Sequence, residues 1–256
     1  MASTSKQKRP VRALQSTIAV GILLATLFTA LPSRGLASGD FYDRLSLILT
    51  PRPVENGAPI APQPQLRIGI VAGHTGNDSG AVCVDGNGEV TLTEVDVNLE
   101  IAAIVQQKLI ERGFQVDLLR EFDTRLNGYR ALAVVSIHND SCEYINDQAT
   151  GFKVAAALNT PDLNRANRLT ACLVDRYKAM TGLTFHAGSI TPDMRENHAF
   201  REIDPTTVAA IIETGFLNLD REILTKQTDR VAAGVVDGII CFANNENVAA
   251  TPTPSP

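Results

Sequence analysis

Residues 66–76 read Leu-Arg-Ile-Gly-Ile-Val-Ala-Gly-His-Thr-Gly. The first seven residues form an apolar run of strand length, and Gly73 and Gly76 then flank His74. Such a run before a glycine-rich turn is typical of a buried strand, because glycine allows the backbone to turn sharply at its end. The sequence therefore predicts a strand at 66–72 with a histidine at its carboxyl end.

The segments that follow alternate between helix and strand patterns. Apolar residues recur at helical spacing after Thr93, a candidate N-cap with Asp96 three positions later, and Gly113 is the expected stop. Further strands are predicted at 114–119, 131–137, 151–158 and 207–212, and further helices at 163–180 and 220–242. Continuous apolar strands between amphipathic helices indicate an α/β fold. We expect a single three-layer domain, with a twisted, mostly parallel or mixed sheet flanked by helices on both faces.

Four residues with ligating or titratable side chains lie near the predicted strand ends. His74, His138 and Glu213 each follow the apolar run of a strand, and Glu94 lies in the first turn of the first helix. Because sites in such sheets gather at the carboxyl ends of strands, we expect these residues near one rim. Two imidazoles and a carboxylate are zinc ligands, and a further carboxylate can manage protons. The residue types therefore predict a hydrolytic zinc site.

Each of these residues taken alone also fits a structural role. A histidine at a strand end is often simply hydrogen-bonded, and the helix dipole favours a carboxylate such as Glu94 in the first turn. Glu213 is harder to explain, because a charge at the end of an apolar strand needs a partner. His186 and His198 fall in the irregular stretch 183–206 and are interpreted as loop residues unless they belong to the site. The joint occurrence favours a site.

The first 37 residues have the pattern of an export signal. Basic residues between Lys6 and Arg12 precede an apolar stretch at 18–31, and Gly35-Leu36-Ala37 supplies small residues for a peptidase. This pattern predicts a secretory signal peptide at 1–37, although an uncleaved signal anchor in the membrane remains the alternative. In either case we expect an exported protein that is secreted, periplasmic or associated with the cell envelope.

Composition separates the remaining chain into three parts. The stretch 38–65 is proline-dense and predicts a linker, and the tail 244–256 ends in Thr-Pro-Thr-Pro-Ser-Pro and predicts disorder. The folded unit is therefore expected at 66–243, and we expect it to be monomeric. Five of the 23 Lys and Arg residues but none of the 28 Asp and Glu residues precede residue 38, so the remainder carries a net charge of −10. An acidic domain disfavours nucleic acid as a partner.

The four cysteines fall within the expected folded unit. None belongs to a Cys-x-x-Cys pair, so a thiolate zinc site is not expected. An even number of cysteines in an exported protein permits disulfides, with three possible connectivities. We favour Cys83–Cys142, because each follows a histidine loop, and Cys172–Cys241, because each lies in a predicted helix. Buried free thiols are the alternative.

Taken together, the motifs resemble a known family. Gly73-His74-Thr75-Gly76, the helix start at Glu94 to Leu99, Ser136-Ile137-His138-Asn139, and the stretch from Ile212 to Asn218 occur in the order found in zinc-dependent N-acetylmuramoyl-L-alanine amidases of the AmiA, AmiC and CwlV type. The resemblance covers about 66–243. The segment between Arg120 and His138 is shorter than usual for the family.

The resemblance implies roles for the residues that match its motifs. His74, Glu94 and His138 would be the zinc ligands, and Glu213 would be the catalytic glutamate. The implied reaction is hydrolysis of the amide that joins N-acetylmuramic acid to L-alanine in peptidoglycan. Two alternatives remain open: another exported zinc peptidase or deacetylase with the same ligands, and a non-catalytic module that binds the cell wall.

Overall fold

The computed structural model describes residues 66–158 and 160–248. The predicted signal peptide at 1–37, the linker at 38–65 and residues 249–256 of the tail lie outside the described residues. The first tail residues lie against the domain, where the Arg168 guanidinium donates to the carbonyl oxygen of Glu246 at 2.7 Å. No helix within the described ranges is both long and apolar enough to span a membrane.

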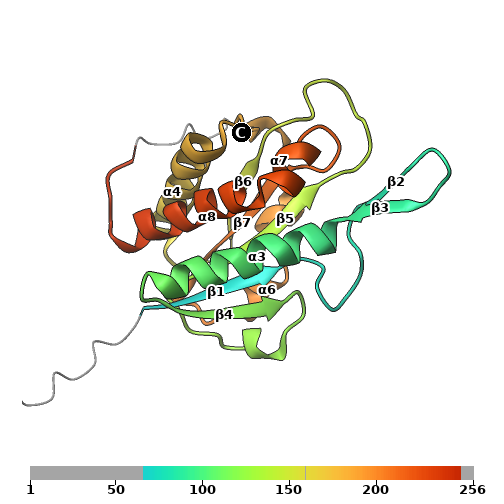
Figure 1. Cartoon of the computed structure of the whole chain (residues 1–256). Coiled ribbons are helices and arrows are strands. Elements are labelled where there is room, and N and C mark those ends of the chain that lie inside the picture. Colours follow the sequence, from blue (N-terminus) through green and yellow to red (C-terminus); the bar gives the residue numbers. More distant parts are fainter. Residues whose placement is uncertain (1–65, 159, 249–256) are drawn as a thin grey trace, which may run out of the picture. The chain divides into compact units, whose positions relative to one another are not determined.

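A five-stranded mixed sheet forms the centre of the domain (Figure 1), as expected. Its spatial order is β4, β1, β5, β7, β6, and these strands span Gln115–Arg120, Arg67–Ala72, Ala133–Asp140, Val208–Phe216 and Lys153–Ala156. The first four are parallel to one another, while β6 runs antiparallel to β7 at the edge. The carboxyl ends of β1, β5 and β7 therefore lie side by side.

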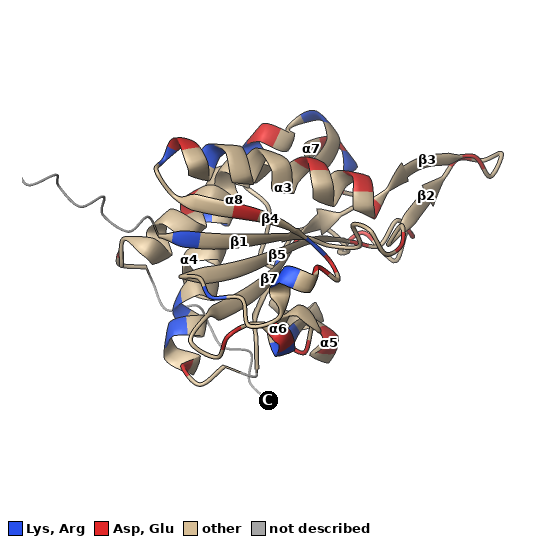
Figure 2. Ribbon diagram, turned by 90° about the horizontal axis from the view of Figure 1, so that it is seen from below, with Lys and Arg blue, Asp and Glu red and all other residues tan. Residues whose placement is uncertain are grey.

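Helices cover both faces of this sheet, which confirms the three-layer expectation (Figure 2). One face carries α3, α4 and α8, at Glu94–Glu111, Leu163–Thr181 and Thr228–Ala243. The other face carries the short helices α5 and α6, at Pro192–Arg195 and Ala199–Glu202, together with the 3-10 turn η1 (Thr124–Leu126). There Met194 and Phe200 are buried with Val71 and Ile211 of the sheet. A second 3-10 turn, η2 (Ala187–Ser189), contacts the edge strand β6. The alternation of side chains along each strand supplies both cores.

Several element boundaries differ from the sequence-based predictions. The helix predicted at 220–242 is two helices, α7 (Arg221–Lys226) and α8, separated at Gln227 by a non-helical backbone with φ −129°. No glycine or proline marks this break. Strands β5 and β7 extend beyond the predicted runs, because their ladder continues through the pair of His138 and Glu213. Both residues thus lie inside strands, near the carboxyl ends, rather than after them.

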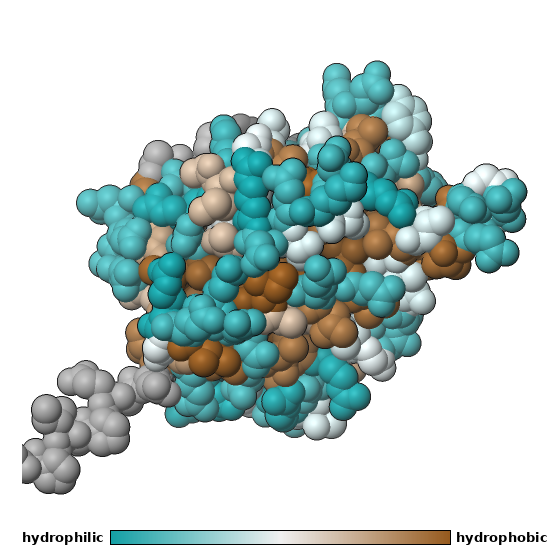
Figure 3. Space-filling model, viewed as in Figure 1, coloured by the Kyte–Doolittle hydropathy of each residue, from teal (hydrophilic) through white to brown (hydrophobic). Residues whose placement is uncertain are grey.

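A two-stranded antiparallel hairpin was not predicted. It comprises β2 (Val82–Val84) and β3 (Val90–Thr93), and it projects from the domain beside the start of α3 (Figure 1). Val84 and Val90 are exposed on it, and Figure 3 shows hydrophobic surface along the hairpin below a hydrophilic tip. The strands are short and mostly exposed, so they lack the long apolar run that identified the central strands.

All four cysteines are paired, as predicted. Cys83–Cys142 joins the hairpin to the loop that follows β5, and Cys172–Cys241 joins α4 to α8. The first disulfide ties together two segments that flank the carboxyl end of the sheet. The second lies in the core between two packed helices.

The α4–α8 contact depends on a glycine. A Cβ atom at Gly238 would lie 2.8 Å from the Cα of Leu173, which is a backbone atom and cannot move without shifting α4. We therefore expect Gly238→Ala to lower the free energy of unfolding by about 1–3 kcal/mol, as overpacked core substitutions do. Chemical denaturation measures this change. The matched control is Gly86→Ala, because a Cβ there would meet nothing within 4 Å. Equal stability of the two variants would contradict the predicted contact.

Candidate active site

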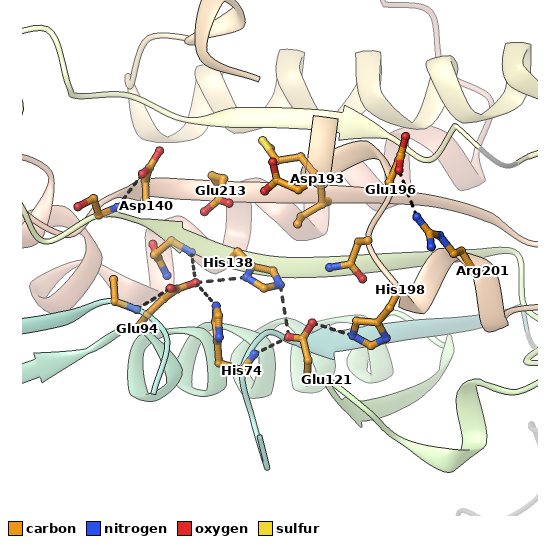
Figure 4. A pocket seen from close by; sticks show the side chains of 16 residues that line it. His74, Glu94, Glu121, His138, Asp140, Asp193, Glu196, His198, Arg201 and Glu213 are labelled. Atoms are coloured by element: carbon orange, nitrogen blue, oxygen red, sulfur yellow. Dashed lines mark hydrogen bonds and ion pairs between the residues drawn. The ribbon is translucent and has the colours of Figure 1, made fainter. Parts of the chain in front are cut away.

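A cavity of about 580 Å³ opens at the carboxyl ends of β1, β5 and β7 (Figure 4). All four residues that the sequence singled out lie on its wall, and four further carboxylates are among the other lining residues. The lining residues are His74, Ala81, Glu94, Glu121, His138, Asn139, Asp140, Ser141, Asp193, Met194, Glu196, Asn197, His198, Arg201, Ile211 and Glu213. The sheet topology thus brings together residues that are far apart in sequence.

His74 is presented by the tight turn after β1. The turn begins with Gly73, whose N–H donates to the carbonyl oxygen of Ile137 on β5 at 3.0 Å. On the His74 ring, Nδ1 lies 2.6 Å from Asp78 Oδ1 and Nε2 lies 3.2 Å from Glu94 Oε1. The contact with Glu94 raises the pKa of His74 to about 9. The turn therefore directs the His74 ring at Glu94, the first residue of α3.

Glu94 begins α3 and is buried, with 5% of its surface exposed. Its Oε2 accepts a hydrogen bond from the N–H of Ala81 at 3.0 Å, which leaves Oε1 directed at both histidines. Burial alone would raise the pKa of this carboxyl. The hydrogen bonds that Glu94 accepts from His138, His74 and the N–H of Ala81 outweigh burial and hold the pKa of Glu94 well below its usual range. The carboxylate is therefore ionised and available as a ligand.

His138 completes a cluster of three donor atoms. Its Nδ1 lies 3.2 Å from Glu94 Oε1, and its ring meets that of His74 edge to face with 5.0 Å between centroids. Burial opposes a charge on His138, but the nearby carboxylates of Glu94, Glu213 and Glu121 raise its pKa. A Cβ atom at Gly73 would lie 2.3 Å from the His138 ring, so only glycine leaves room for this arrangement.

The three donors fit a zinc ion by geometry and by chemistry. His74, Glu94 and His138 each offer one ligand atom, and these atoms all lie within 4.8 Å of one another. Ligand atoms 2.0–2.2 Å from a tetrahedral zinc are about 3.3–3.6 Å apart. The two nitrogen–oxygen separations of 3.2 Å in the cluster are close to that spacing. Two imidazoles and one carboxylate also leave a position open for water, as catalytic zinc sites do.

Glu213 lies beside this cluster on the neighbouring strand. It is paired in register with His138, but no hydrogen bond joins the two side chains. Its Oε2 is buried and has no hydrogen-bond partner among the described residues. Burial raises the pKa of Glu213 to about 7. This carboxyl group is therefore near the donor cluster without belonging to it, and it is not committed to another partner.

Comparison with known proteins identifies the family. The family model described as N-acetylmuramoyl-L-alanine amidase matches residues 68–241. The chain belongs to this amidase family. A search of curated proteins gives no match. The matched range contains every residue of the donor cluster and Glu213, so the family assignment and the cavity refer to the same part of the molecule.

Solved amidase structures share the fold of this amidase-family chain. An N-acetylmuramoyl-L-alanine amidase from Clostridium difficile 630 is 23% identical with a TM-score of 0.57, over 72% of this chain and 100% of that one. The catalytic domain of CwlV from Bacillus (Paenibacillus) polymyxa var. colistinus is 26% identical with a TM-score of 0.53, over 70% and 99%. The amidase Ami1 from Mycobacterium smegmatis is 17% identical with a TM-score of 0.56, over 71% and 98%. These matches confirm the α/β fold.

The cavity also holds residues that the sequence analysis did not select. Glu121 directly follows β4, so the rule that polar residues gather after strand ends would have found it. His198 lines the cavity, although it was interpreted as a loop residue, because the segment before α6 folds back over the sheet. His186 is outside the cavity lining, and its Nδ1 lies 2.6 Å from Ser189 Oγ. No local sequence signal distinguishes these two histidines.

Proposed function

We propose that this chain is a zinc-dependent hydrolase that cleaves the amide between N-acetylmuramic acid and L-alanine in peptidoglycan. The observation that carries the proposal is the convergence of His74, Glu94 and His138 within 4.8 Å, in the cavity of a chain that belongs to the amidase family. The nature of the bond follows from the family. The dependence on zinc follows from the donor set.

The proposed roles divide the four residues into ligands and a proton carrier. His74, Glu94 and His138 would hold the ion, with Glu94 balancing part of its charge. With the ion held by these residues, the site would lower the pKa of a bound water towards neutrality and would polarise a carbonyl group. The buried position of Glu94 and His138 excludes solvent from one side of the cluster.

Glu213 would act as general base and then as general acid. In the described part of the chain no partner competes with its Oε2 for a proton, and the residue lines the cavity next to the donor cluster. In this role Glu213 takes a proton from the attacking water and delivers it to the nitrogen of the leaving L-alanine. The amide bond breaks, and the lactyl group of the sugar is left as a carboxylic acid.

The proposed setting of the reaction is outside the cytoplasm. Two disulfides are present, and such bonds persist in oxidising compartments. We propose that residues 1–37 direct export or anchor the chain, that 38–65 form a linker, that 66–243 are the catalytic domain, and that 244–256 form a tail. The substrate of the enzyme is then the cell wall or fragments of it. The enzyme acts as a monomer and does not bind nucleic acid.

Product analysis tests this function. Purified protein incubated with peptidoglycan is expected to release peptides with a new N-terminal alanine, detected by end-group labelling and mass spectrometry. A chelator should stop the release and added Zn²⁺ should restore it. A freed amino sugar would instead identify a deacetylase, and a different new N-terminus a peptidase. Binding to peptidoglycan with no soluble product would identify a non-catalytic module.

A further inference from the structure

Glu121 contacts both histidines of the donor cluster, although the sequence analysis did not select it. It follows β4, whose last residue Arg120 pairs with Ala72 at the end of β1. The sheet register therefore places Glu121 beside the turn that carries His74. Only 6% of its surface is exposed, so its charge is held by protein contacts rather than by water.

The first contact fixes the backbone of His74. The N–H of His74 donates to Glu121 Oε2 at 2.5 Å, and the N–H of Glu121 donates to the carbonyl oxygen of Thr75 at 3.2 Å. His74 has a φ of 65°, in the left-handed region that residues with a side chain seldom adopt. Such a conformation persists where its surroundings determine it. Glu121 thus holds the turn that aims the His74 ring at Glu94.

The second contact concerns the ring of His138. Its Nδ1 faces Glu94 Oε1 at 3.2 Å, while its Nε2 faces Glu121 Oε2 at 3.6 Å. His138 Nε2 is buried and has no hydrogen-bond partner within the described part of the chain, so the Glu121 carboxylate is the acceptor that faces it. An acceptor on one ring nitrogen favours the tautomer with its proton there, and this leaves the lone pair of the other nitrogen free for a metal.

A third contact holds Glu121 itself. His198 Nε2 lies 2.9 Å from Glu121 Oε1, and the His198 ring stacks on Phe122 with 3.9 Å between centroids and 13° between planes (Figure 4 shows the His198–Glu121–His138 chain). His198 directly precedes α6, on the face of the sheet opposite α3, and its side chain makes no capping hydrogen bond to that helix. The two carboxylate oxygens of Glu121 therefore contact different residues: Oε1 faces His198, and Oε2 faces the two histidines of the cluster.

We propose that Glu121 is a positioning residue for the metal centre, oriented by His198, that holds His74 and His138 in the conformations that bind the ion. This inference rests on the zinc site of the proposed function. Partners that orient metal-binding histidines typically change metal affinity by about 10–100-fold when they are removed. Glu121 needs no contact with substrate or metal for this effect, so metal affinity is the property that reports it.

The test compares zinc affinities of the folded apoproteins. Glu121→Gln keeps an oxygen that can accept from the His74 N–H but removes the charge that faces His138 and His198. We expect its Kd for Zn²⁺, measured by competition with a chromophoric chelator, to rise about 10–100-fold. The visible spectrum of the Co²⁺-loaded variant should also change. Glu196→Gln removes the same charge from the same cavity without a contact to either ligand histidine, and it should bind Zn²⁺ as the wild type does.

A second pair of variants does not disturb the His74 turn. His198→Ala should also weaken Zn²⁺ binding, and His198→Gln should restore part of the affinity, because its amide N–H can donate to Glu121. Equal Zn²⁺ affinity of wild type, Glu121→Gln and His198→Ala would overturn the inference while leaving the proposed function intact. A wild-type protein that binds no Zn²⁺ would overturn both.

Discussion

Glu213→Gln is expected to bind zinc as tightly as the wild type and to lower kcat by about 10²–10⁴-fold, the usual contribution of a general acid–base group. The reason is that glutamine preserves the size of the side chain but cannot take a proton from water. Glu213 is not within the three-atom donor cluster, so its loss should not release the ion. Turnover on peptidoglycan and metal content after dialysis measure the two effects separately.

The control for this variant is Glu222→Gln. Glu222 lies on α7, outside the cavity lining, and pairs with Lys226 near the surface at 3.7 Å. The Glu222→Gln substitution removes the same charge as Glu213→Gln, and this variant should retain full turnover. A zinc-loaded Glu213→Gln protein with wild-type kcat would show that another group manages the proton.

His138→Ala is expected to abolish both zinc binding and turnover. The substitution removes one of the three metal donors. The loss of zinc affinity should therefore be larger than the change of about 10–100-fold that is typical when a residue orienting a ligand is removed. The substitution also removes one of the two imidazoles that stabilise the charge of the buried Glu94 carboxylate. Metal analysis, chelator competition and the peptidoglycan assay measure the expected losses.

His186→Ala is the matched control for the histidine substitution. His186 is partly buried and meets the Phe216 ring edge to face at 5.9 Å, but it lies outside the cavity lining. This variant should keep zinc and turnover even if its thermal stability falls. Retention of stoichiometric zinc by His138→Ala would remove His138 from the ligand set and refute the proposed centre.

The central sheet could be predicted because its inner strands β1, β5 and β7 are apolar along most of their length. The same reasoning placed His74 and Glu94 correctly, since a turn after a strand and the first turn of a helix are both marked by local residues. The hairpin was missed although Asp85-Gly86-Asn87-Gly88 is a turn signal, because its strands are short and exposed. Local sequence patterns therefore predict the elements that are buried in the core, and they miss elements that are exposed.

The remaining part of the site depends on tertiary folding. The segment 183–206 contains two four-residue helices, α5 and α6, which are too short to show a helical period. Nothing in the sequence around His198 indicates that it meets Glu121, 77 residues away. His198 lines the cavity and His186 does not, because of the way this segment packs over the sheet. The buried side chains of Met194 and Phe200 make that packing contact.

The disulfide between the hairpin and the loop after β5 shortens the path between two of the proposed ligands. Glu94 and His138 are 44 residues apart along the backbone, but through Cys83–Cys142 only about fifteen residues separate them. Loop-closure scaling makes their encounter in the unfolded chain easier by about 1 kcal/mol. The disulfide therefore lowers the entropic cost of bringing two of the proposed ligands together, so an oxidising compartment contributes to assembling the site.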